Sequence, residues 1–90
     1  MSYIEIYTKS YCPFCKRAKA LLDSKGVTYS EYEVSTDENL QQEMRTRSER
    51  RTVPQVFIDG QHIGGSDDLL IAEQSGLLDK LLDSRKEAAA

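Results

Sequence analysis

Apolar positions along this chain recur with two different periods, and the changes between them divide the chain into secondary-structure elements. Residues 3–7 alternate as a strand does, and residues 27–34 carry the valine, threonine and tyrosine residues that favour strands. Between them, apolar residues recur at helical spacing from Pro13, which suits a first helical turn, to Gly26, a typical helix stop. The first third of the chain therefore predicts a β-α-β unit.

The middle of the chain predicts a polar helix followed by a β-hairpin. Residues 35–37 offer three candidate N-caps, and the helix after them has a narrow apolar face and extends to about Arg47. Residues 53–58 are typical of a third strand. The Asp-Gly pair at 59–60 is a strong signal for a two-residue turn, and it leads into a short fourth strand at 61–63.

The last part of the chain predicts two helices and a loose end. A glycine-rich turn leads into a helix over 67–74, Gly76 ends this helix, and a leucine stripe at 77–82 predicts one more short helix. Residues 84–90 have no apolar anchor beyond alanine, so we expect them to fray. The whole order predicts an α/β fold in one domain over 1–83, with a four-stranded mixed sheet flanked by helices.

Composition is ordinary for a soluble globular protein, because 39 % of the residues are hydrophobic and 30 % are charged. No apolar run approaches the roughly 20 residues that a membrane span needs. The first residues lack the basic start and apolar run of a signal peptide, so we expect a cytoplasmic protein. The net charge of −3 argues against a nucleic-acid partner. No large apolar stripe requires a dimer, so we expect a monomer.

Basic residues gather in two places although the net charge is negative. One cluster surrounds the cysteines and the other lies near the end of the second predicted helix: Lys9, Lys16, Arg17 and Lys19, and Arg45, Arg47, Arg50 and Arg51. If the fold brings the two clusters together, one face of the protein is locally positive. The arginine cluster is equally compatible with a solvated face.

The two cysteines, Cys12 and Cys15, have a spacing that is typical of reactive rather than structural thiols. A disulfide stabilises a fold mainly by closing a long loop, and a bridge between these two would close a very small one. A zinc site needs about four ligands. Since His62 is the only histidine, we expect no metal centre. Redox chemistry and an inert core pair remain, and the position of the pair after a strand favours redox chemistry.

The two thiols are expected to play different parts in disulfide exchange, in which the thiolate is the nucleophile. Cys12 stands where the first helix begins, and unpaired backbone N–H groups and the helix dipole favour negative charge there. Lys9 and Lys16 are close in sequence and add to this effect. Cys15 lies one helical turn further in, so we expect it to be less exposed and to attack a mixed disulfide on Cys12.

The chain resembles the glutaredoxins, in particular the small bacterial dithiol type. Four segments carry the match: Ile6-Tyr7-Thr8-Lys9, Cys12-Pro13-Phe14-Cys15, Thr52-Val53-Pro54-Gln55-Val56-Phe57-Ile58 and Gly64-Gly65-Ser66-Asp67-Asp68-Leu69. Cys-x-x-Cys alone is only moderately specific, but its combination with Thr-Val-Pro and Gly-Gly-x-Asp-Asp at these spacings is highly specific. The resemblance implies a thioredoxin fold and an enzyme, a disulfide oxidoreductase that takes its electrons from glutathione.

The resemblance also implies a glutathione-binding site made by residues from several parts of the chain: Lys9, Phe14, Gln41, Thr52, Val53, Pro54, Gly65, Ser66 and Asp67. In such proteins the proline that matches Pro54 is cis and faces the reactive cysteine. This geometry frees the backbone of Val53 to pair with the substrate as an added strand would. Lys9 and Gln41 match positions that hold the glycine carboxylate of glutathione.

The remaining site residues have matching chemical roles. Gly65, Ser66 and Asp67 form a turn at a helix N-terminus, which suits the γ-glutamyl carboxylate. The Asp67 carboxylate suits the ammonium group of glutathione. Phe14 matches an aromatic position beside the thiol, and Thr52 lines the groove.

Several of these residues also have plainer interpretations. Asp67 is a good helix N-cap, Lys9 fits a solvated loop, and Gln41 fits an exposed helix surface. The chain also departs from the common family pattern. Phe14 replaces a tyrosine, Gln41 is neutral where bacterial relatives often have arginine, and Glu49 stands where a glycine often ends the second helix. A residue other than glycine there is either strained or extends the helix.

The implied activity is reduction of protein disulfides and of protein–glutathione mixed disulfides. Two other functions fit parts of the sequence. An iron–sulfur cluster carrier holds one cluster between two chains and two glutathiones, but such relatives usually have Cys-Gly-Phe-Ser and avoid a rigid residue such as Pro13. A glutaredoxin-like protein served by thioredoxin reductase requires a degraded glutathione site, whereas residues 52–54 and 65–67 match the family pattern.

Overall fold

The computed structural model describes residues 3–82. The segment predicted to fray, 84–90, and the predicted domain end at residue 83 both lie outside the described residues. Within 3–82, no helix is long and apolar enough to cross a membrane.

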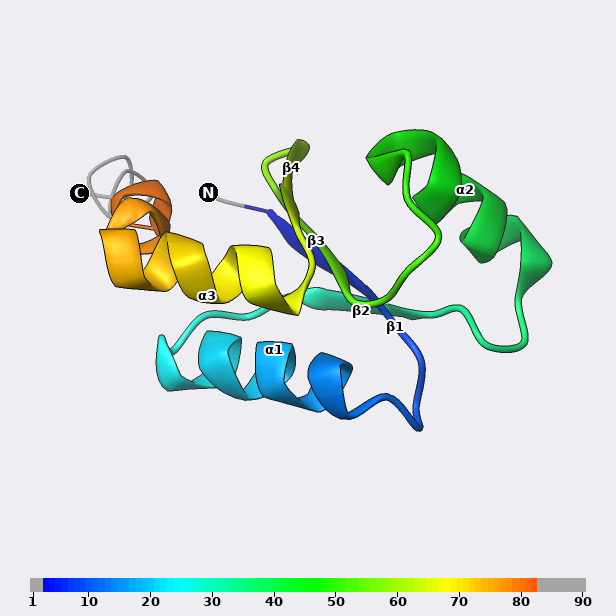
Figure 1. Ribbon diagram of the computed structural model, residues 1–90, viewed down its shortest axis with the longest axis horizontal. Coiled ribbons are helices and arrows are strands. Elements are labelled where there is room, and N and C mark those ends of the chain that lie inside the picture. The colour runs from blue at the N-terminus through cyan, green and yellow to red at the C-terminus, as the bar shows by residue number, and fades with distance from the viewer. Residues whose placement is uncertain (1–2, 83–90) are drawn as a thin grey trace.

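A four-stranded mixed sheet forms the centre of the molecule, with the strand order β2-β1-β3-β4 (Figure 1). β1 (Ile4–Thr8) runs parallel to β2 (Ser30–Glu33). β3 (Gln55–Ile58) runs antiparallel both to β1 and to β4 (Gln61–Gly64). The predicted sheet, with one parallel pair and one hairpin, is therefore confirmed.

Helices cover both faces of this sheet. α1 (Pro13–Ser24) and α3 (Ser66–Ser75) lie along one face, and α2 (Glu38–Ser48) lies on the other (Figure 1). A further short helical stretch follows at 77–82. The order of helices and strands is the predicted one, β-α-β-α-β-β-α with a short helix after it.

The ends of the elements differ from the predictions by one to three residues. β2 begins at Ser30, because residues 27–29 carry the chain back from α1 to the sheet before pairing starts. Of the three candidate caps for α2, Asp37 is the one used, and its carboxylate accepts a hydrogen bond of 3.0 Å from the backbone of Leu40. α3 begins at Ser66, one residue earlier than predicted.

Glu49 ends α2 in the left-handed conformation, with φ 57° and ψ 26°. Its backbone N–H donates to Arg45 O over 2.8 Å, which is the usual way in which a left-handed residue closes a helix. Of the two outcomes expected for a residue other than glycine, the chain adopts the strained one and the helix is not extended.

Each face of the sheet has its own core. On the α1 and α3 face, strand residues meet helix residues: Ile4, Ile6, Val56 and Ile58 pack with Ala18, Leu22, Leu69 and Ala72. On the α2 face, the core consists of Tyr7, Val34, Met44 and Phe57. Because β1 is covered on both sides, all five of its residues are buried, including the charged Glu5.

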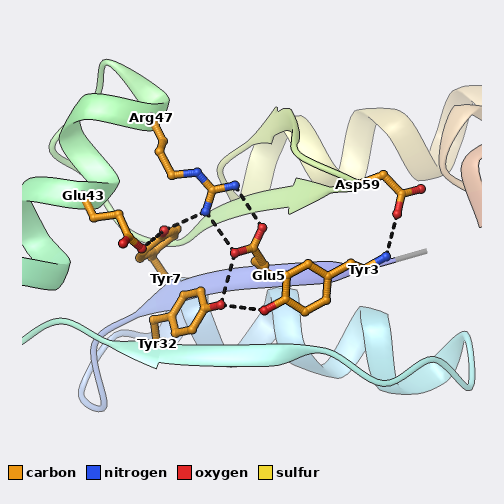
Figure 2. Close-up of polar contacts among 7 residues, drawn as sticks. All are labelled: Tyr3, Glu5, Tyr7, Tyr32, Glu43, Arg47 and Asp59. Atoms are coloured by element: carbon orange, nitrogen blue, oxygen red, sulfur yellow. Dashed lines mark hydrogen bonds and ion pairs between the residues drawn. The ribbon is translucent and has the colours of Figure 1, made fainter. Parts of the chain in front are cut away.

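Arg47 of α2 neutralises this buried carboxylate (Figure 2). Its two terminal nitrogens donate to the two oxygens of Glu5 at 2.9 and 3.0 Å, and one of them also donates to the hydroxyl of Tyr7 at 2.8 Å. The guanidinium lies 4.1 Å from the ring centre of Phe57. The pKa of Glu5 is lowered chiefly by the Arg47 hydrogen bonds. Arg47 is therefore an anchor of α2 and not part of a solvated face.

Tyrosine hydroxyls extend this polar cluster along the sheet (Figure 2). Tyr32 donates to Glu5 at 3.1 Å, and its hydroxyl lies 2.8 Å from that of Tyr3. The hydroxyl of Tyr7 donates to Glu43 of α2. Burial raises the pKa of Tyr7 to about 12, so this phenol stays neutral at physiological pH and keeps its proton as the donor of the hydrogen bond to Glu43.

Candidate active site

Cys12 is the N-cap of α1. Its backbone is extended, with φ −90° and ψ 116°, and Pro13 follows as the first helical residue. Cys12 N donates to Lys9 O over 3.1 Å, which fixes the loop that joins β1 to α1. The side chain makes no capping hydrogen bond and is partly exposed. Its sulfur therefore lies at the positive end of the helix, within reach of solvent.

Cys15 lies one turn further along α1 and is buried, with 1 % of its surface exposed. Both cysteines are free thiols. Burial raises the pKa of Cys15 to about 12, and the neighbouring Cys12 adds to this effect against a backbone hydrogen bond from Lys9. Cys15 is therefore a protonated thiol at neutral pH in this structure.

A groove of about 310 Å³ opens beside Cys12. Its lining comes from the start of α1, the segment before β3 and the start of α3: Phe14, Arg50, Thr52, Val53, Pro54, Gly65, Ser66, Asp67 and Asp68. The Val53–Pro54 peptide bond is cis, as the resemblance implied. The Cys12 sulfur lies 3.9 Å from Val53 O, so this segment passes next to the partly exposed thiol.

Glycines make the other wall of the groove possible. Gly64 has φ 126°, and a Cβ atom on it would lie 2.3 Å from the carboxylate of Asp68. A Cβ atom on Gly65 would lie 3.3 Å from Pro54 O, so this position also brings two backbone segments close together. The Asp68 carboxylate accepts a hydrogen bond of 2.9 Å from Gly65 N.

Gly65, and not Asp67, is the N-cap of α3. The plain capping role considered for Asp67 is therefore wrong, because Asp68 supplies the carboxylate of the capping box. Asp67 lies in the first turn of the helix, exposed to solvent and on the groove. Its charge remains available for a ligand there.

The structure brings most of the residues that the resemblance implied into one lining: Phe14, Thr52, Val53, Pro54, Gly65, Ser66 and Asp67. Lys9 and Gln41 lie outside this lining. The amide of Gln41 donates to Val34 O over 2.7 Å, at the end of β2. Lys9 is half-buried in the loop before Cys12. These two residues lie beyond the end of the parallel strands.

Sequence reasoning missed two residues of the lining, Arg50 and Asp68. They form an ion pair of 2.7 Å, and the Arg50 hydrogen bond is the largest of the effects that lower the pKa of Asp68. The signals were present, because Asp68 belongs to the Gly-Gly-Ser-Asp-Asp segment and Arg50 to the second basic cluster. The spacing did not show that these charges face one another.

Comparison with known proteins decides the family. The family model described as Glutaredoxin matches residues 4–63. The chain belongs to the glutaredoxin family. It is 55 % identical over 82 residues to Glutaredoxin 3 of Escherichia coli strain K12, which covers 91 % of this chain and 99 % of that protein. This glutaredoxin is thus a small bacterial dithiol type and a glutathione-dependent thiol–disulfide oxidoreductase.

Solved structures agree with this assignment. A buckwheat glutaredoxin–glutathione complex superposes with a TM-score of 0.84 at 32 % identity, covering 92 % of this chain and 78 % of that one. A Brucella melitensis glutaredoxin superposes with a TM-score of 0.78 at 49 % identity, covering 89 % and 87 %. The thioredoxin-type fold predicted for this glutaredoxin is confirmed. Among residues 3–82, no group of three or more histidine, cysteine or acidic side chains could hold a metal ion.

Proposed function

We propose that Cys12 is the nucleophile of this glutaredoxin and that Cys15 is its resolving thiol. The contrast between the two sulfurs carries this proposal. Cys12 is partly exposed beside a groove at a helix N-terminus, whereas burial raises the pKa of Cys15 to about 12. Cys12 therefore meets the substrate first, and Cys15 acts once a disulfide has formed next to it.

Glutathione docks in the groove beside Cys12. Its cysteinyl unit pairs with the backbone of Val53, next to cis-Pro54 and close to the reactive sulfur. The backbone N–H groups of Gly65 to Asp67, at the start of α3, receive the γ-glutamyl carboxylate. The Asp67 carboxylate binds the ammonium group, and Thr52 and Phe14 form the side walls. The buckwheat complex supports this assignment, because that relative is a glutathione complex.

Lys9 and Gln41 extend the site toward the glycine end of glutathione. They lie outside the groove, near the loop after β1 and the end of β2. An extended tripeptide anchored at Asp67 and passing Cys12 points its other carboxylate toward this region. Lys9 supplies the charge, and Gln41 supplies a neutral amide that already donates to Val34 O.

Removal of glutathione from a protein proceeds in two exchanges. The Cys12 thiolate attacks the glutathione sulfur of the mixed disulfide, and the protein thiolate leaves and takes a proton from water. A second glutathione thiolate attacks the glutathione sulfur now bound to Cys12. Oxidised glutathione leaves, and the Cys12 thiolate is restored.

Reduction of a protein disulfide needs both cysteines. Cys12 attacks one sulfur of the target and releases the other as a thiolate. Cys15 then passes its proton to the released target thiolate and attacks the Cys12 sulfur, so that the second target sulfur leaves as a thiolate and a Cys12–Cys15 disulfide remains. Two glutathione molecules reduce this disulfide and leave as oxidised glutathione. The partners are therefore glutathione and proteins that carry disulfides or bound glutathione, and we propose that the enzyme acts as a cytoplasmic monomer.

The first experiment measures turnover of a glutathionylated peptide with glutathione, glutathione reductase and NADPH, beside an assay with thioredoxin reductase. We expect activity in the glutathione assay. Cys12→Ser should abolish it, whereas Cys15→Ser should keep removal of glutathione and lose most of the reduction of a protein disulfide. Activity with thioredoxin reductase alone, or in Cys12→Ser, would overturn the proposal.

A second experiment tests Asp67. We expect Asp67→Asn to raise the KM for glutathione with little change in melting temperature, because its charge meets the ligand and does not cap α3. Glu38→Gln is the matched control, since it removes a first-turn charge from α2, away from the groove. Equal kinetics for the two variants would contradict the role of Asp67.

A further inference from the structure

Gln55 is a buried polar side chain next to the groove that the proposed mechanism does not use. It is the first residue of β3, directly after cis-Pro54, and its exposed fraction is 0 %. It pairs in register with Tyr7 of β1, so its side chain lies on the α2 face of the sheet. A buried amide is costly unless each of its polar atoms is hydrogen-bonded.

Both ends of the Gln55 amide have partners, and one of them belongs to the groove. Its nitrogen donates to the backbone oxygen of Thr52 at 3.0 Å and to the Thr52 hydroxyl at 3.1 Å. Thr52 lines the groove together with Val53 and Pro54. The amide thus holds Thr52 at two points, in the segment that passes next to Cys12.

His62 of β4 is the partner of the other end of this amide. Its Nε2 atom lies 2.7 Å from Gln55 Oε1, and an amide oxygen can only accept, so Nε2 must carry the proton. The imidazole packs against Phe57, with ring centres 5.0 Å apart. If the amide were reversed, its NH₂ group would face this N–H and its oxygen would face Thr52 O. Thr52 O can only accept, so it selects the orientation that presents NH₂ to Thr52, and His62 completes the arrangement by donating to Oε1.

We propose that Gln55 is a positioning residue for glutathione, and that it acts by holding Thr52 and the backbone of the groove wall in their binding geometry. His62 in turn supports the Gln55 amide by pairing with its oxygen. The inference rests on the proposed docking of glutathione in this groove. It assigns a function to a polar interaction inside the sheet, where an apolar side chain would otherwise pack.

The test compares variants of similar size. Gln55→Glu keeps the shape of the side chain and an oxygen that can pair with His62, but it loses the NH₂ donor to Thr52. Gln55→Leu removes the hydrogen bonds to both Thr52 and His62. We expect each to raise the KM for glutathione by about tenfold, the loss of one or two hydrogen bonds, with kcat changed less than twofold. His62→Phe should shift KM in the same direction by a smaller factor, because it keeps the ring on Phe57.

Tyr32→Phe is the matched control, since it removes hydrogen bonds to Glu5 and Tyr3 on the same face of the sheet, away from the groove. We expect it to lower the melting temperature and leave the KM for glutathione unchanged. If the Gln55 variants lose thermal stability as this control does but keep a normal KM, Gln55 is only structural and the inference is wrong. Failure of the proposed function is distinguishable, because the wild-type enzyme itself would then show no glutathione-dependent turnover.

Discussion

Asp68 Oδ2 lies 2.7 Å from a terminal nitrogen of Arg50 and 2.9 Å from the backbone nitrogen of Gly65. One carboxylate oxygen therefore connects the segment that follows α2 to the first turn of α3. Both side chains also line the groove beside Cys12. The contact joins the two walls of the groove at a point where their backbones are already close, because Gly65 faces Pro54 O.

Replacement of Asp68 by alanine is expected to destabilise the protein by about 1 kcal/mol at pH 7, the usual cost of a lost N-terminal cap. Arg50 and Gly65 hold the pKa of Asp68 below its ordinary value of 3.8. The contribution of the ionised group is thus complete above that value and is lost as the pH falls through the lowered pKa. Urea denaturation of both proteins across this range should show the difference become smaller in acid, where the neutral carboxyl can still accept from Gly65 N.

Asp68→Asn separates the two roles of this carboxylate. Its amide oxygen can still accept from Gly65 N, while the attraction to Arg50 is removed. We expect most of the stability to return, because the ion pair is nearly half exposed and such pairs contribute little. Alanine and asparagine variants that are equally unstable would show that the ion pair dominates.

Arg47, which anchors α2 to Glu5, is expected to contribute more to the free energy of unfolding than Asp68 does. Arg47→Met should cost about 2 kcal/mol at pH 7, because it leaves the buried carboxylate of Glu5 without its charged partner. Arg47 lowers the pKa of Glu5 from its ordinary value of 4.5. The stability that the pair contributes is therefore lost as the pH falls through the lowered pKa, and the two proteins should become more alike there.

Arg45→Met is the matched control for this prediction. Arg45 lies on the same helix and is exposed, and its guanidinium donates to Gln41 of the same helix at 3.5 Å. Chemical denaturation at pH 7 should show little change in this variant. An Arg45→Met loss as large as that of Arg47→Met would mean that the charge of α2, and not the contact with Glu5, is responsible.

The elements that periodicity describes well were predictable from the sequence. The strand, helix and hairpin signals gave the correct order, and Pro13, Gly76 and the Asp-Gly turn marked ends that the structure confirms. Most residues of the groove lining were predicted from the resemblance to the glutaredoxins, because the family motifs assign segments distant in sequence to one site. These features depend on local propensity or on a motif, so a single amino-acid sequence is enough to predict them.

Contacts between side chains on different elements were not predictable. In an alternating strand, Glu5 is expected to face solvent, but β1 is central and α2 covers that face. Its partner Arg47 therefore could not be distinguished from the other arginines of its cluster. The same holds for Gln41, whose amide binds the end of β2 instead of lining the groove.

The left-handed residue that ends α2 offers a stabilising substitution. Glu49→Gly should raise the free energy of unfolding by about 1 kcal/mol, because a side chain at φ 57° is strained and glycine is not. Part of this gain is offset by the greater freedom of glycine in the unfolded chain. Urea denaturation measures the change. Glu49→Ala keeps the strain and removes only the carboxylate, so a similar gain in that variant would attribute the effect to charge.

The contrast between the two thiols predicts selective alkylation. In the reduced protein at pH 7, iodoacetamide should modify Cys12 and leave Cys15 intact, because burial keeps the reagent away and raises the pKa of Cys15 to about 12. Mass spectrometry should therefore find one adduct per native chain and two after unfolding in urea. Phe14→Ala is a second variant for the same measurement, since it removes an exposed ring beside Cys12 while Cys15 stays in the core. We expect it too to give one adduct per native chain. Rapid modification of Cys15 in the folded protein would show that it is accessible and ionised, and the proposed division of labour between the two cysteines would then be wrong.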